Sequence, residues 1–189
     1  MNRYRIRTML CKFLDVTRPP EKADLIFVFA GREERKRYGL ELYEKGYAPR
    51  IILSVGRFEW RRFTELGLAS DGGLVTLVAT IEAPKRHFFV EIAGTETTCR
   101  AVAPERYGTL TEARAFATRV EDDENNAAKT ILLVSSPEHS RRCLMATKSF
   151  MARRHRLIPI GCAPSRDSCV RELVKWIGYR ALTATCAGQ

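Results

Sequence analysis

Four short apolar runs constrain the fold of this chain more than any other feature. Each is rich in branched or aromatic residues and ends in small residues: ADLIFVFAG (23–31), PRIILSVG (49–56), TILLVSS (130–136) and HRLIPIGC (155–162). Continuous apolar runs of this length are typical of strands buried on both faces of a parallel sheet. Helical patterns follow them, over residues 32–46, 109–120, 138–154 and 167–182. This alternation predicts an α/β fold with a doubly wound, mostly parallel sheet.

Other segments predict additions to this sheet. An apolar stripe predicts an accessory helix over about 3–15, which Pro19 and Pro20 end. Residues of about 87–103 read as strand, glycine turn and strand, which predicts a hairpin at the edge of the sheet. Residues 73–81 have helical spacing. At 189 residues, the chain predicts a single domain over 1–189 with one core.

The composition excludes several classes of protein. The chain is 45% hydrophobic and 29% charged, and it has no apolar run of the roughly 20 residues that a membrane helix needs. Its N-terminal segment lacks the pattern of a secretory signal. The six cysteines show no zinc or redox spacing, so we expect reduced, buried thiols, a cytoplasmic protein and no membrane partner. They are Cys11, Cys99, Cys143, Cys162, Cys169 and Cys186.

The chain is strongly basic, with a net charge of +10 and a pI near 9.6. This charge favours an acidic partner: nucleic acid, an anionic membrane surface or a phosphorylated small molecule. A solvated basic surface explains the same charge without any partner. No segment interleaves aromatic with basic residues at a recognisable spacing, which argues against nucleic acid and favours an anionic small molecule. The oligomeric state is not predicted.

Polar residues gather where the predicted strands end. In open parallel sheets, ligands bind outside the carboxyl ends of the strands, where helix N-termini favour anions. We therefore expect an anion site there, with His139 as a general acid or base and Arg35 and Arg142 as the clamp. The other predicted ligand-binding residues at these ends are Gly31, Arg32, Ser54, Gly56, Ser135 and Ser136.

Structural explanations for the same residues are left open. Ser136 precedes a proline and suits a helix N-cap. Thr109 and Glu112 match a capping box, an alternative to Glu112 as a catalytic base. His139 and Arg35 fit equally well on a solvated helix surface. His87 and His155 begin strands and are interpreted as structural, and no spacing predicts a metal site.

Several segments together resemble the YdcF-like family, which contains SanA and ElyC and is catalogued as domain of unknown function 218. The resemblance covers residues 23 to about 164. It is carried by ADLIFVFAG with Arg35 and by three further segments: LELYEKGYAPRIILSVG, ERYGTLTEA and LLVSSPEHSRR. The most specific block is the second, and the last matches a family pattern that maps onto Ser135, Ser136, His139 and Arg142.

The resemblance implies a three-layer Rossmann-like sandwich with a polar pocket at the carboxyl edge, in which Thr111 and Glu112 also take part. Some members are linked to bacterial envelope biogenesis. The chain departs from the family pattern at Val55, where glycine is common, and at Leu110, where an asparagine usually precedes Thr111. Losing that amide removes a donor and an acceptor from the pocket, so the ligand or the activity has room to differ.

Two functions follow from these patterns. The first is a metal-independent hydrolase or transferase acting on a phosphorylated or nucleotide-like small molecule, with His139 as acid or base. The second is a binding module without turnover, whose ligand is a nucleotide or S-adenosylmethionine. The absence of an obvious nucleophile motivates the second reading, and the sequence does not decide between them.

Overall fold

A computed structural model describes residues 3–56, 59, 79–82, 85–103, 108–122, 127–164 and 169–186. Six strands form one sheet in the order β4-β3-β2-β1-β5-β6. The strands β2, β1, β5 and β6 are parallel, whereas β3 and β4 form an antiparallel hairpin beside β2. Their bounds are β1 (Leu25–Val28), β2 (Arg50–Val55), β3 (Phe88–Ala93), β4 (Glu96–Ala101), β5 (Thr130–Ser135) and β6 (Arg156–Gly161).

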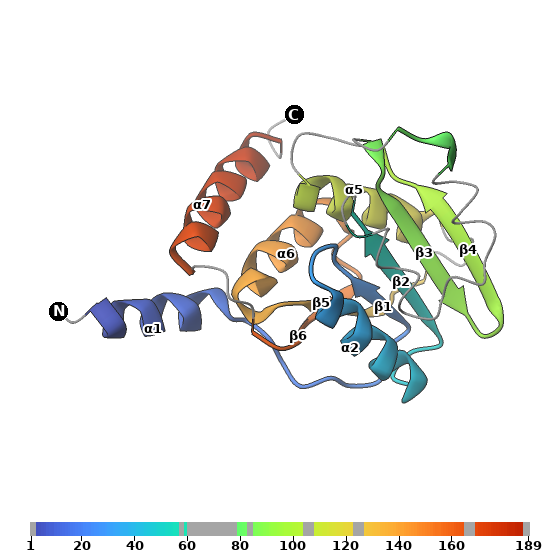
Figure 1. The fold of residues 1–189 in the computed structure, drawn as a ribbon, viewed down its shortest axis with the longest axis horizontal. Coiled ribbons are helices and arrows are strands. Elements are labelled where there is room, and N and C mark those ends of the chain that lie inside the picture. The colour runs from blue at the N-terminus through green and yellow to red at the C-terminus, as the bar shows by residue number, and fades with distance from the viewer. Residues whose placement is uncertain are drawn as a thin grey trace.

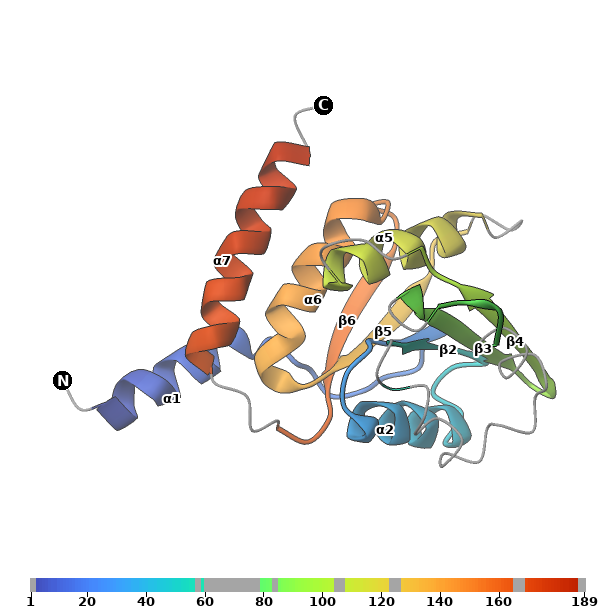
Figure 2. The same ribbon diagram turned by 45° about the horizontal axis from the view of Figure 1, so that its top comes forward.

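Helices cover both faces of this sheet (Figure 1). Helix α2 (Glu33–Glu44) packs on one face, and α5 (Gly108–Glu121) and α6 (Pro137–Phe150) lie on the other. Helices α1 (Arg3–Leu14) and α7 (Cys169–Cys186) pack against α6 and against each other, outside the sandwich (Figure 2). The fold is therefore the predicted three-layer Rossmann-like α/β sandwich with a mostly parallel sheet.

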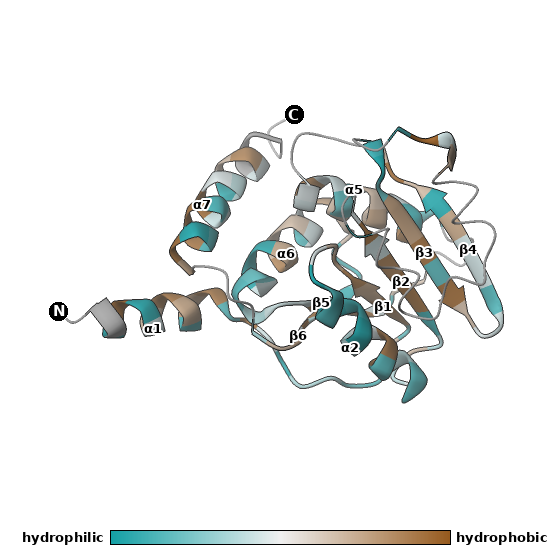
Figure 3. Ribbon diagram, in the orientation of Figure 1, coloured by the Kyte–Doolittle hydropathy of each residue, from teal (hydrophilic) through white to brown (hydrophobic). Residues whose placement is uncertain are grey.

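The core forms on both faces because successive side chains of a strand point to opposite sides. Val28 and Leu53 pack toward Leu42 of α2, whereas Phe27 points to the other face and stacks on Phe116 of α5 with ring centroids 3.9 Å apart. Figure 3 shows hydrophobic colour on the central strands and hydrophilic colour over much of α2. Burial on both faces explains why the strand sequences are continuously apolar.

The predicted additions appear with small changes. Helix α1 matches the predicted helix over 3–15, and β3 and β4 form the predicted hairpin, with Gly94 at a φ of 61° in its turn. Helix α6 ends at Phe150, earlier than predicted, because Met151 takes an extended conformation. The helix predicted over 73–81 lies almost wholly outside the described residues.

Two cysteines contradict the expectation of reduced thiols. Cys11 of α1 and Cys169 of α7 form a disulfide with a Cα–Cα distance of 5.5 Å. They are separated by 158 residues and meet only because α1 packs against α7, so their spacing in the sequence could not reveal the pair. Cys99, Cys143 and Cys162 are free thiols.

Candidate functional site

Strand direction decides which residues meet at the candidate site. The carboxyl ends of β1, β2 and β5 lie at one edge of the sheet because these strands are parallel. Strand β3 runs the other way, so its first residue, Phe88, pairs with Val55 at the carboxyl end of β2. His87, which precedes Phe88, therefore lies at the same edge. Its interpretation as a purely structural residue overlooked this geometry.

A buried carboxylate organises the first part of the edge. Glu112 Oε1 accepts hydrogen bonds from the Ala30 amide at 2.7 Å and from the Ser54 hydroxyl at 2.6 Å. Ser54 Oγ also lies 2.8 Å from His87 Nε2. A hydroxyl has one hydrogen, and Ser54 gives it to Glu112, so His87 donates its Nε2 hydrogen to Ser54. This tautomer leaves His87 Nδ1 as an acceptor.

The charge state of His87 suits an acceptor. Burial lowers the pKa of His87, although the nearby Glu112 carboxylate opposes that effect. Because the ordinary histidine pKa is about 6.5, a lowered value leaves the imidazole neutral at pH 7. The Glu112, Ser54 and His87 side chains thus form a hydrogen-bonded relay that ends in a neutral imidazole with 13% side-chain exposure.

A second carboxylate, that of Glu59 in the loop after β2, contacts the loop after β1. Glu59 accepts a hydrogen bond from the Gly31 amide and forms an ion pair with Lys36, whose side chain is 3% exposed. Burial raises the pKa of Glu59, and the Lys36 charge acts in the opposite direction. Glu59 therefore already occupies the Gly31 amide, which the sequence analysis had expected to bind an external anion.

Arg35 is buried at the same edge, and its partners are uncharged. Its Nε donates to Ser136 Oγ at 3.1 Å and its Nη1 donates to the Ala30 carbonyl at 2.6 Å. Within the described residues, no ion pair neutralises this guanidinium. Gly31 packs against it: an added Cβ would lie 2.6 Å from Arg35 Nη1, and the Gly31 φ of 138° favours glycine.

Ala30 joins these groups into one site. Its amide donates to Glu112 and its carbonyl accepts from Arg35, so both side chains lie against the same residue. Gly56 lies alongside, since an added Cβ there would meet the Ala30 methyl group at 3.5 Å. The carboxyl edge thus brings together Arg35 and the relay that ends in His87.

A third cluster lies further along α6. His139 Nδ1 and Arg142 Nη2 lie 2.7 Å and 3.0 Å from Glu172 Oε2 of α7, and Arg142 Nη1 also donates to Thr109 Oγ1. Burial opposes the ionisation of Glu172, but the His139 hydrogen bond and the Arg142 charge outweigh it and hold the pKa of Glu172 well below its usual range. The predicted pair His139 and Arg142 therefore already has a carboxylate partner.

Both predicted capping roles differ from the observed contacts. The capping box is wrong: Glu112 bonds the Ala30 amide and Ser54, while the Thr109 hydroxyl accepts from Arg142. Ser136 occupies the N-cap position of α6 but makes no side-chain cap hydrogen bond, because its hydroxyl accepts from Arg35. Tertiary partners have displaced the local ones in both helices.

The remaining predicted residues contribute less. Arg32 is exposed and pairs with Glu34 at 2.7 Å, while Thr111 is buried in the first turns of α5. Ser135 is buried and donates to the Ser136 carbonyl at 3.2 Å.

Two chemistries find no support in the described part of the chain. No three His, Cys, Asp or Glu side chains there are grouped to hold a metal ion. Cys143 lies close to the edge, but burial raises the pKa of its thiol to about 11, so it stays protonated at pH 7.

Among the described residues, no helix has the length and apolar character required to cross a bilayer.

Neither a protein-family model, nor a curated protein, nor a solved structure matches the chain. Its chemistry is therefore inferred from the geometry of the carboxyl edge.

Proposed function

We propose that this protein is YdcF-like and binds a small phosphorylated or nucleotide-like molecule at the carboxyl edge of its sheet. The observation that carries this proposal is Arg35, whose guanidinium is buried, with the residue 6% exposed, and whose hydrogen bonds within the described residues go to a carbonyl and a hydroxyl. A buried charge is costly unless an opposite charge compensates it. A phosphate beside Arg35, near the N-termini of α2 and α6, supplies that charge.

His87 is the better candidate for the acid or base. Its Nδ1 is an acceptor, and the relay through Ser54 to Glu112 fixes the tautomer, as a general base requires. His139 instead contacts Glu172 and Arg142 in a buried cluster. The proposed reaction class is metal-independent hydrolysis or group transfer, with His87 in the role that the sequence assigned to His139.

A binding module without turnover is the second candidate. Ser54, Ser135 and Ser136 are at most 1% exposed, so none of their hydroxyls is accessible as a nucleophile. Carboxylates also hold the Ala30 and Gly31 amides. In this alternative the edge holds a nucleotide or S-adenosylmethionine, and His87 orients it.

Calorimetry with inorganic phosphate and adenosine monophosphate tests the binding step. Arg35→Lys keeps the charge but removes the paired donors, and it should weaken the preferred probe ten- to a hundredfold, since hydrogen bonds to charged groups contribute about 1.5–3 kcal/mol. Arg32→Lys, at the exposed N-cap position directly before α2, is the matched control and should change affinity by less than threefold. Equal affinities for wild type and Arg35→Lys would rule out this anion site.

Turnover of p-nitrophenyl phosphate separates the two candidates. For an enzyme, His87→Gln should lower kcat by a hundredfold or more while phosphate still binds, because general base catalysis contributes about 10²–10⁴-fold. The lowered pKa of His87 means that activity should persist to a pH below 6.5 before protonation removes it. Binding without any His87-dependent turnover favours the module, and dependence on His139 alone contradicts the reassignment.

A further inference from the structure

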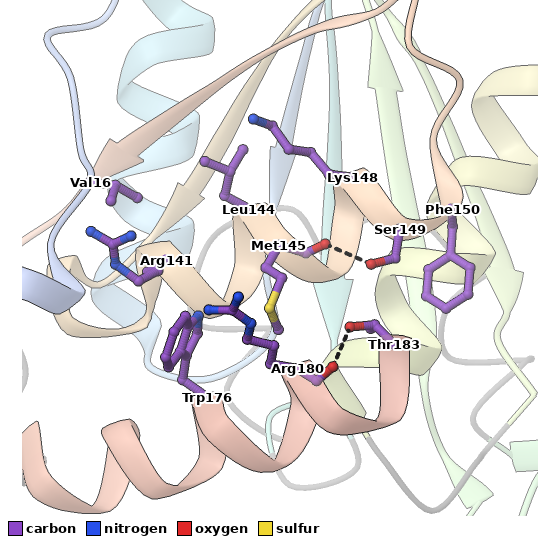
Figure 4. A pocket seen from close by; sticks show the side chains of 10 residues that line it. All are labelled: Val16, Arg141, Leu144, Met145, Lys148, Ser149, Phe150, Trp176, Arg180 and Thr183. Carbon is purple, nitrogen blue, oxygen red and sulfur yellow. Dashed lines mark hydrogen bonds between the residues drawn. The ribbon is translucent and has the colours of Figure 1, made fainter. Parts of the chain in front are cut away.

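Two adjacent cavities lie on the outward side of α6, away from the residues of the carboxyl edge. Their volumes are about 620 and 660 Å³, and both are lined by Val16, Leu144 and Lys148. The first cavity lies between α6 and α7 (Figure 4), and the second continues toward β6. Each volume falls in the range that holds a ligand of nucleotide size. We call the two together the α6 groove.

The walls of the α6 groove are positively charged. None of the described residues that line the two cavities is acidic, whereas six of them are lysine or arginine. Arg156 pairs with Glu21, and among the described residues no ion pair holds the other five. The six cations are Arg18, Arg141, Lys148, Arg153, Arg156 and Arg180.

Aromatic rings lie among these cations. Trp176 lines the first cavity with Arg180 positioned over its ring, 5.5 Å from the centroid, and Figure 4 shows the two side by side. The Trp176 Nε1 atom is buried and has no hydrogen-bond partner. Because this N–H is enclosed, other parts of the indole line the cavity, and the side chain offers a ligand its ring rather than a hydrogen-bond donor. Phe150 closes the far end of the same cavity.

We propose that the α6 groove binds single-stranded nucleic acid. Proteins that hold single strands combine a basic groove for the phosphates with aromatic or guanidinium planes on which bases stack. Two neighbouring cavities with Lys148 in their shared wall suit a ligand that repeats a phosphate and a base. Five of the six cations are arginines, whose planar fork matches phosphate geometry.

The shape of the groove favours a single strand over other anionic partners. A duplex keeps its bases stacked inside, whereas an unpaired base can enter a cavity. A membrane surface is broad and flat, so it would not reach the side chains inside a concave groove. The sequence argued against nucleic acid because no one segment interleaves aromatic and basic residues. The fold assembles that combination from two separate helices, α6 and α7, with β6 between them in the chain.

Fluorescence anisotropy with labelled single-stranded deca-thymidylate tests the proposal. At low salt the wild-type protein should bind this probe, and the double variant Lys148→Ala/Arg180→Ala should weaken binding about tenfold. Two lost phosphate contacts should also reduce the slope of log Kd against log salt by about 1.4. Trp176→Phe keeps a ring but reduces the stacking surface, and it should weaken binding about threefold.

A charge-matched control makes the outcome specific to the groove. The double variant Lys45→Ala/Arg100→Ala also removes two exposed cations, from the end of α2 and from β4, far from the groove. It should change affinity by less than twofold. Equal weakening by both double variants, no binding of the probe at low salt, or groove-dependent binding of polyglutamate or phosphatidylglycerol vesicles in place of it would overturn the proposal. Circular dichroism verifies the fold of each variant.

Discussion

Arg141 and Arg142 are neighbours in the sequence but lie in opposite surroundings. Arg142 points inward, is 7% exposed and contacts Glu172, Thr109 and His139. Arg141 points outward into the α6 groove, where its Nε donates to the Phe13 carbonyl and its guanidinium lies 4.2 Å from the centre of the Phe13 ring. Two adjacent arginines therefore differ in their surroundings: one lies in a buried ion pair and the other lies in the groove.

The difference lies in where α7 places its carboxylate. Glu172 is the acidic residue of α7, and it is turned toward α6 with 1% exposure. It neutralises the inner side of α6 and leaves the outer side with uncompensated cations. An arginine with a buried carboxylate partner stabilises the fold, whereas an exposed arginine without one is available to an external anion.

Removing the inner carboxylate should have the largest effect on stability. Glu172→Gln leaves the buried Arg142 without a counter-charge, and breaking a buried pair from one side typically costs about 3–5 kcal/mol. Chemical denaturation should show a loss of this size. Lys175→Gln is the control, because Lys175 is 43% exposed and contacts the same carboxylate, so its loss should cost less than about 1 kcal/mol. A Glu172→Gln loss below 1 kcal/mol would contradict the contrast between the two sides.

The same variant predicts a pH dependence. The folded pKa of Glu172 is depressed, so its contribution is present above the ordinary pKa of about 4.5 and is lost as pH falls toward the folded value. The stability difference between wild type and Glu172→Gln should therefore be constant from pH 5 to 7 and shrink below pH 4.5. A difference that grows in acid would assign the stabilisation to another group.

The sequence predicted the features that depend on local pattern. The apolar runs that became β1, β2, β5 and β6 are buried on both faces, and that burial is what made them readable. Arg35 was expected at the carboxyl edge because its helix follows the first predicted strand, and its hydrogen bonds to the Ala30 carbonyl and to Ser136 lie at that edge. Both predictions needed only the period and order of the predicted strands and helices.

The features it missed depend on contacts between distant segments. His87 reached the edge because β3 runs antiparallel, and a strand pattern carries no direction. Glu172 and Cys169 act on partners 30 and 158 residues away. The resemblance to the YdcF-like family ends near residue 164, before α7, so it gave no information on either residue.

The next prediction concerns the disulfide that links α7 to α1. Cys169→Ser removes the bond to Cys11 that closes a loop of 158 residues, and losing a native disulfide typically costs about 2–4 kcal/mol. Since α7 carries Glu172 and Trp176, this loss should weaken both the buried ion pair on the inner side of α6 and nucleic-acid binding on the outer side. Thermal denaturation and the deca-thymidylate assay measure the two sides separately.

Two controls isolate the disulfide. Cys99→Ser removes a thiol that is not in the bond and should change stability by less than about 1 kcal/mol. Dithiothreitol should destabilise the wild type and leave Cys169→Ser unaffected. Disulfides persist in oxidising compartments. If dithiothreitol does not change the stability of the wild type, Cys11 and Cys169 are reduced thiols, as expected of a cytoplasmic protein.

The smallest expected change in stability belongs to the outer side. Arg141→Ala removes a contact with the Phe13 ring at a partly exposed site, so we expect a loss under about 1 kcal/mol by chemical denaturation. The same variant should still weaken deca-thymidylate binding severalfold, because it deletes one phosphate contact from the α6 groove. A small effect on stability with a clear effect on binding is the opposite of what Glu172→Gln should give. If Arg141→Ala instead destabilises the protein as much as Glu172→Gln does, the outer cations stabilise the fold. That result would contradict the proposal that the α6 groove binds a ligand.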